Sequence, residues 1–157
     1  MPKVLLSDIV EAMEMQNDLS CHYYHIPTGE IVFIRDDDFL HAESDNNLND
    51  FADWEIESIN KAKDIIGNTD YIELPTSFDI HEYRMMENFS LSISGDIGGI
   101  LYDNLSGSGA FRRFKDNINR FELEDKWYKY REESYYEIAK GWCEANEIPF
   151  VDDRKKN

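Results

Sequence analysis

The residues best suited to bind an anion lie in one stretch of the chain, from Gly107 to Arg120. The stretch opens with a Gly/Ser turn and is followed by the basic cluster of an otherwise acidic protein. A turn that leads into a helix leaves backbone N–H groups unpaired at the positive end of the helix dipole. Arginine adds paired donors that match phosphate or carboxylate. We therefore predict an anion- or partner-binding site at Gly107, Gly109, Arg112, Arg113, Lys115 and Arg120.

Three interpretations of this cluster stay open at the level of sequence. In the structural one, Arg112 pairs with Asp116 four residues later, and Arg113 and Arg120 pair with glutamates of neighbouring helices. In the second the helix binds a protein, and in the third it binds a small anion or a nucleotide. A P-loop is excluded, because the pattern GxxxxGK[ST] is absent.

A second group of residues is acidic and lies between the predicted hairpin and the next helix. Its members are Asp36, Asp37, Asp38, Glu43, Asp45, Asp50 and Asp53, with His41 nearby. Hard cations take several carboxylate oxygens, but the spacing lacks the alternating carboxylates, central glycine and closing glutamate of a calcium loop. We expect a solvated loop here and no metal site.

The histidines and cysteines do not form a catalytic pattern. His22 and His25 lie three residues apart in a predicted strand and should face opposite sides of it. His81 precedes a glutamate but lacks the second histidine of HExxH. Cys21 and Cys143 lie far apart without a CxxC motif, which is typical of free thiols in a reducing compartment. We expect no catalytic residue and no cofactor.

The formal charge of −17 is concentrated in one part of the chain. Residues 1–110 hold 5 basic and 22 acidic side chains, whereas residues 111–157 hold 11 of each. Such acidity opposes phosphate contacts, so we expect no general binding to nucleic acid. It favours basic partners and keeps the chain soluble. No apolar run reaches the ~20 residues of a membrane span, and the N-terminus lacks signal-peptide character, so we predict a cytoplasmic protein.

The hydrophobic pattern predicts the elements that position these residues. Helices are expected at about 7–16, 51–66, 79–93, 96–105, 111–121 and 124–145, and strands at about 21–25, 31–34 and 71–74. Ser7 is the predicted cap of the first helix, and Asp79 with Glu82 forms a capping-box pattern. Pro27 to Gly29 is the expected turn of a β-hairpin.

This order of elements predicts an α+β fold, mostly helical, with a small antiparallel hairpin near the N-terminus. A chain of 157 residues fits one domain, which we place at residues 1–150, followed by a frayed tail at 151–157. Phe111, Phe114, Ile118 and Phe121 recur at helical spacing and are expected to be buried.

Aromatic residues cover more than one face of the last predicted helix. Trp127 and Trp142 define an inward stripe, whereas Tyr128 and Tyr136 fall outside it. Exposed aromatics next to arginines are typical of interface hot spots. The other interpretation is that a sheet packs on this helix and buries both faces.

Several segments resemble one family across nearly the whole chain. They are the run GSGAFRRFKDNINRF, Trp127-Tyr128, Ala139 to Trp142, Leu6 to Asp8, Thr28 to Glu30 and Leu74-Pro75. In these the chain resembles the bacterial uncharacterised protein family 158, and it departs from that pattern at Ser108 and at Gly141 to Cys143. The resemblance implies a single bacterial cytosolic domain and no particular activity.

From these observations we predict a non-catalytic cytoplasmic binding or regulatory module. It would engage an unidentified protein partner through the helices at Phe111–Arg120 and Trp127–Tyr136, or a basic partner through its acidic part. A homodimer is compatible with the same aromatic surface. The alternative is an enzyme or sensor that binds a phosphate-bearing small molecule at the helix N-terminus from Gly107 to Arg113.

Overall fold

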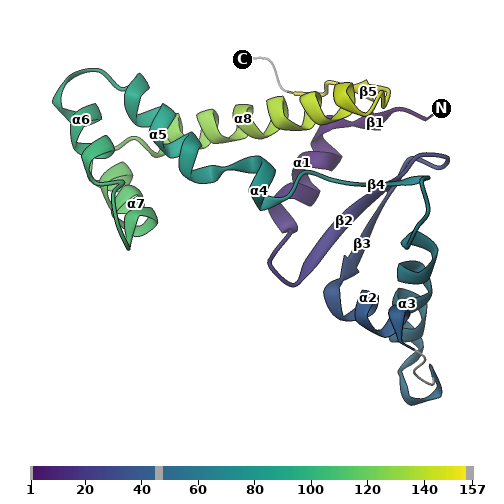
Figure 1. Cartoon of the computed structure of the whole chain (residues 1–157). Coiled ribbons are helices and arrows are strands. Elements are labelled where there is room, and N and C mark those ends of the chain that lie inside the picture. The colour runs from purple at the N-terminus through teal and green to yellow at the C-terminus, as the bar shows by residue number, and fades with distance from the viewer. Residues whose placement is uncertain (1, 45–47, 155–157) are drawn as a thin grey trace. The chain divides into compact units, whose positions relative to one another are not determined.

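A computed structural model describes residues 2–44 and 48–154 of the chain (Figure 1). Its internal contacts divide the chain into two compact units. The first unit comprises Met1–Ser77 with Ala139–Asn157, and the second comprises Phe78–Ile138. The long helix α8 (Glu124–Ala145) therefore contributes its first part to the second unit and its last turns to the first.

An antiparallel sheet lies at the centre of the first unit. Its strands are β2 (Ser20–His25), β3 (Glu30–Arg35) and β4 (Tyr71–Glu73), in the order β3-β2-β4. The predicted β-hairpin is confirmed, with His22 opposite Phe33 and Tyr24 opposite Ile31. Gly29 closes its turn at φ +74°, a conformation that other residues rarely adopt. Among the described residues, strand β3 pairs with β2 alone and is thus an edge of the sheet.

The two faces of this sheet pack against different helices. On one face Val32 and Ile34 form a core with Ala62 and Ile65 of α3 (Asp53–Ile65). Figure 1 shows α3 beside α2 (Asp36–Glu43). On the other face Tyr24 is fully buried and meets the Trp142 ring edge-on, at 6.0 Å between centroids.

Helix α2 replaces most of the polar loop that the sequence predicts after the hairpin. The first turn of α2 consists of Asp36, Asp37 and Asp38, and negative charge there is stabilised by the helix dipole. Asp38 is 2% exposed and accepts a hydrogen bond from the Arg35 N–H, which caps the helix. A short 3₁₀ helix, Leu48–Asp50, follows, and Asp45 lies outside the described residues.

The two ends of the described chain meet in a short parallel pair. Strand β1 (Val4–Leu5) pairs with β5 (Phe150–Val151), just before α1 (Leu6–Met15). The prediction of Ser7 as a helix cap is wrong, because α1 begins one residue earlier and the Ser7 hydroxyl instead donates to the Asp153 carboxylate. The predicted boundary at residue 150 thus falls within β5.

The second unit is helical. Its helices are α4 (Ser77–Ile80, which starts in the first unit), α5 (Glu82–Ser92), α6 (Gly95–Asp103), α7 (Ala110–Arg120) and the first part of α8. The single helix predicted over 79–93 is interrupted at His81, whose left-handed backbone (φ 50°, ψ 60°) separates α4 from α5.

Aromatic rings form the core of the second unit. The Trp127 ring lies 4.8 Å from Phe114 and 5.3 Å from Phe89, in edge-to-face contacts. Such pairs add to the stability that burial supplies. The fold class predicted from sequence, a mostly helical α+β protein with a small antiparallel sheet, is confirmed. Among the described residues no helix is long and apolar enough to cross a membrane.

Candidate functional site

The Gly/Ser turn before α7 is built around two glycines with positive φ. Gly107 has φ +80° and Gly109 has φ +79°, so the chain bends where a side chain would cause strain. Gly109 is the N-cap residue of α7, and its carbonyl accepts a hydrogen bond from the Arg113 N–H at 3.0 Å. Both glycines lie where the sequence predicts an anion site.

The Arg113 side chain folds back onto this turn. Its Nε donates to the carbonyl of Asn104 at 3.0 Å, its Nη1 donates to that of Ser108 at 2.6 Å, and its Nη2 donates to that of Ser106. The guanidinium is thus hydrogen-bonded to three carbonyl oxygens. Arg113 is half-buried and holds the segment between α6 and α7 in place, which satisfies carbonyl groups that follow the end of α6.

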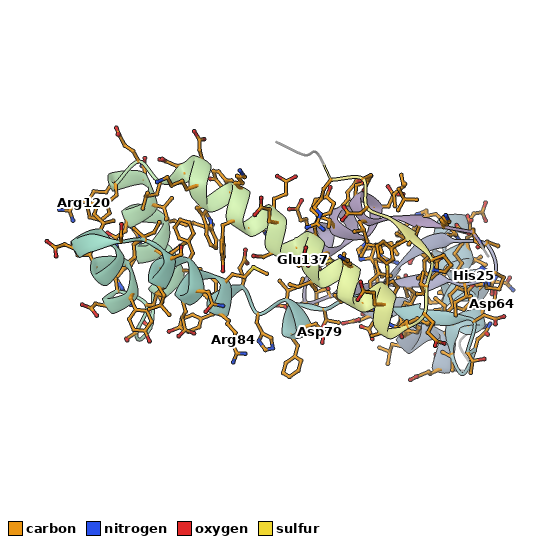
Figure 2. The ribbon with its side chains drawn as sticks, turned by 90° about the horizontal axis from the view of Figure 1, so that it is seen from above. His25, Asp64, Asp79, Arg84, Arg120 and Glu137 are labelled. Atoms are coloured by element: carbon orange, nitrogen blue, oxygen red, sulfur yellow. The ribbon has the colours of Figure 1, made fainter. Side chains whose placement is uncertain are left out.

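The other cations of the predicted cluster make no hydrogen bond to this turn within the described residues. Arg112 and Lys115 are exposed and make no ion pair within the described residues, so the expected pair between Arg112 and Asp116 is not formed there. Arg120 lies at the opposite end of α7, ~12 Å along the helix from Arg112, with its guanidinium 5.0 Å from the Phe121 ring centre. Figure 2 labels Arg120 at that end.

The predicted inward face of α7 is right for Phe114 and Ile118 and wrong for Phe111. Phe114 is 1% exposed, whereas Phe111 is 50% exposed. Phe111 is the second residue of the helix, after the buried Ala110, and lies at the edge of the apolar stripe. Lys115 lies one turn from both Phe111 and Arg112, so these three exposed residues form one continuous surface, which we call the outer face of α7.

The tyrosines of α8 that lie outside the predicted inward stripe differ in burial. Tyr136 lies outside the Trp127 stripe but is buried, which fits packing on a second face. Tyr128 is 63% exposed, as an interface residue would be. The two tyrosines thus differ in burial, and the interface interpretation of Tyr128 stays a prediction.

The acidic residues after the hairpin also differ in burial. Asp38 is buried and ion-paired to Arg35 at 3.0 Å, whereas Asp36 and Asp37 are exposed. Within the described ranges, the His, Cys, Asp and Glu side chains form no group of three that could hold a metal ion. His41 instead packs its ring 4.7 Å from that of Phe51.

The histidines of β2 face opposite sides of the strand, as the sequence predicts. His25 bonds the Thr28 hydroxyl through Nδ1 at 2.7 Å and lies over the Tyr71 ring. His22 is 7% exposed, its ring lies edge-on to Phe33 at 5.2 Å, and its buried Nδ1 has no hydrogen-bond partner among the described residues. Burial lowers the pKa of His22 below its usual value.

Both cysteines carry free thiols of low reactivity. Burial raises the pKa of each thiol to about 11, with smaller contributions from Glu73 near Cys21 and from Glu144 near Cys143. The thiolate is the nucleophilic form, and a pKa this high leaves almost none of it at neutral pH. This chemistry does not favour nucleophilic catalysis by either cysteine.

Two surface features were missed by the sequence analysis because packing creates them. One is a hollow of about 450 Å³ in the second unit between α4, α5 and α8, with Asp79, Arg84 and Glu137 among its lining residues (Figure 2). The other is a groove along β3 in the first unit, at Phe33. The left-handed His81 that helps to shape the hollow has no signal in the sequence pattern.

Comparison with family models, with curated proteins and with solved structures finds no match to this chain. The resemblance to the bacterial uncharacterised protein family 158 therefore stays a prediction.

Proposed function

We propose that this protein is a non-catalytic binding module that engages a protein partner through the outer face of α7. The observation that supports it is the exposure of Phe111 beside Arg112 and Lys115. Arg113, by contrast, uses its guanidinium within the protein. Neighbouring arginines in one helix thus differ in role, and Arg112 stays available to a partner.

The chemistry of this face indicates an acidic partner. An aromatic ring and an arginine are the side chains most often found at interface hot spots, where they lose their water on binding. Two cations within one turn attract carboxylates and disfavour basic surfaces. The cytoplasmic location belongs to the same proposal and is supported by the two free thiols.

The alternative is an enzyme or sensor that binds a phosphate-bearing small molecule at Gly107 to Arg113. It has weaker support, because an anion at this turn would compete with three carbonyl oxygens for the Arg113 donors. Only Arg112 and Lys115 would then supply cations. A homodimer would be a case of the first proposal, with a second copy of the chain as the partner of the same face.

The test is affinity capture with three baits from a native lysate, followed by affinity measurement with the purified partner. The baits are the wild type, Phe111→Ala/Arg112→Ala and a matched control, Phe78→Ala/Arg84→Ala, which removes another exposed aromatic and arginine. We expect one acidic protein to be retained by the wild type and the control and lost with the α7 variant. Retention by all three baits contradicts the proposal.

A second arm of the same experiment addresses the alternative. Pyrophosphate and ATP are added to the wild type and to Arg112→Ala while the melting temperature is followed, because a ligand that binds the folded state raises it. A saturable rise that Arg112→Ala abolishes favours the phosphate-binding alternative over the protein-binding module.

A further inference from the structure

A groove follows strand β3 along the sheet face opposite α3. It consists of two hollows, of about 340 Å³ and about 580 Å³, that share Phe33. Gly29, Ile31 and Phe33 line the first hollow, and Phe33, Arg35 and Asp37 line the second. Alternate residues of a strand face the same side, so this β3 groove runs the length of the strand, ~20 Å.

Both ends of the β3 groove are negative. Asp8 and Glu11, one turn apart on α1, line the first hollow. Asp18, Asp36 and Asp37 line the second. These five carboxylates make no ion pair within the part of the chain that the structure describes. The lining cation, Arg35, is held by Asp38 at 3.0 Å and lies 4.8 Å from the Trp54 ring centre.

The middle of the β3 groove is apolar. Phe33 is 48% exposed there, although its neighbours in the strand, Val32 and Ile34, are buried. Met15 lines the first hollow and is 61% exposed, and Leu19 lines the second and is 75% exposed. Three large apolar side chains next to one another on a surface this acidic mark a place where a partner excludes water.

The floor of the β3 groove contains an unsatisfied polar group. His22 lines the first hollow and is more than nine-tenths buried, and no residue in the described part of the chain hydrogen-bonds to its Nδ1. A buried nitrogen without a partner destabilises the free protein. A ligand that hydrogen-bonds to this imidazole would remove that cost.

We propose that the β3 groove binds an extended, cationic segment of a partner protein, in which two basic side chains flank an apolar one on the same face of the segment. The basic side chains meet the carboxylates at the two ends, and the apolar one packs on Phe33. The two basic residues are i and i+4 of an extended chain and lie ~13 Å apart, so their long side chains reach both hollows. This site lies in the first unit and does not depend on the α7 face.

The extended conformation follows from the position of β3. Within the ranges 2–44 and 48–154 the strand pairs with β2 alone and is an edge of its sheet, so the backbone along its other side can pair with an added strand. A metal ion is a poorer occupant, because the acidic side chains of the groove do not form a ligand group of three within the described residues.

The test is an NMR titration of the ¹⁵N-labelled full chain with two peptides of equal composition. The probe is acetyl-Arg-Thr-Leu-Thr-Arg-amide, which places both arginines and the leucine on one face when extended. The control, acetyl-Arg-Arg-Leu-Thr-Thr-amide, has the same charge in the wrong pattern. We expect saturable amide shifts along β3 and α1, a shift of the His22 imidazole nitrogens, and at least about tenfold weaker binding of the control peptide.

Two protein variants separate the groove from general charge attraction. Asp8→Asn/Glu11→Gln removes two carboxylates at the groove, and Asp125→Asn/Glu132→Gln removes two exposed ones from α8. The amide spectra report whether each variant is folded. We expect about tenfold weaker binding in the first variant and little change in the second, with affinity falling as salt is added.

Three results overturn the proposal. The first is equal weakening in both variants, which means that the peptide responds only to net charge. The second is the absence of saturable shifts up to millimolar peptide. The third is a set of β3 and α1 shifts that depends on protein concentration without peptide, which identifies a second copy of the chain as the occupant.

Discussion

The Nε of Arg113 donates a 3.0 Å hydrogen bond to the carbonyl oxygen of Asn104, the C-cap residue of α6. The same guanidinium reaches two further carbonyls of the turn before α7. One side chain thus joins the end of one helix to the start of the next. Charged hydrogen bonds to backbone carbonyls are among the stronger contacts of a folded chain.

Replacing Arg113 should therefore cost stability, whereas replacing Arg112 should not. We expect Arg113→Ala to lower the free energy of unfolding by about 2 kcal/mol, because three carbonyls lose a charged donor. Arg112→Ala is the matched control, with an expected change within ~0.5 kcal/mol. Urea unfolding measures both. Equal effects of the two substitutions would contradict the assignment of Arg113 as a structural arginine.

The adjacent glycines of α6 should respond in opposite ways to alanine. A Cβ at Gly98 would lie 2.0 Å from the Ile93 carbonyl oxygen, so Gly98→Ala forces the backbone apart and should cost about 2 kcal/mol or more. A Cβ at Gly99 would have no atom of the described residues within 4 Å, apart from its two chain neighbours and its own helix backbone. Gly99→Ala should stabilise by ~0.5–1 kcal/mol, because alanine favours helix. The denaturant midpoints of the two variants measure these changes in stability. Destabilisation by both substitutions would contradict the described packing of α6.

The buried carboxylate of α2 should matter more than its exposed neighbour. Asp38→Ala removes both the cap on the Arg35 N–H and the ion pair, and we expect a loss of about 1–2 kcal/mol. Asp37→Ala removes a charge from the same helix turn without a buried contact, and its cost should stay near ~0.5 kcal/mol. Thermal and urea unfolding measure the stability of both variants, and a larger loss in Asp37→Ala than in Asp38→Ala would contradict this prediction.

Stability should decrease in mild acid partly through His22. Burial lowers the pKa of this histidine in the folded protein below its usual 6.5. The unfolded chain therefore takes up a proton near pH 6.5 while the folded chain does not, so its contribution is complete above that pH and is lost as the pH falls. We expect the free energy of unfolding to fall less steeply from pH 7.5 to 5.5 in His22→Phe than in the wild type. Identical slopes would show that His22 does not titrate differently on folding.

The sequence by itself determined the elements whose signals are local. The spacing of Phe114 and Ile118 identifies the buried face of α7, and the Pro27–Gly29 turn sets the register of the hairpin. The helical periodicity of α3 and the short strand β4 were likewise predicted, because hydrophobic spacing and turn residues act over a few positions.

Only the tertiary structure decided which side chains are engaged and which are available. Arg112 and Arg113 look alike in the sequence, and their roles differ because the path of the turn brings the Asn104 carbonyl to one of them. Asp37 and Asp38 differ in the same way through the Arg35 contact. The β3 groove arises where α1 packs beside an edge strand, and no short pattern reports that contact. Local sequence specifies an element and its apolar face, whereas partners distant in the chain are specified only when those elements pack.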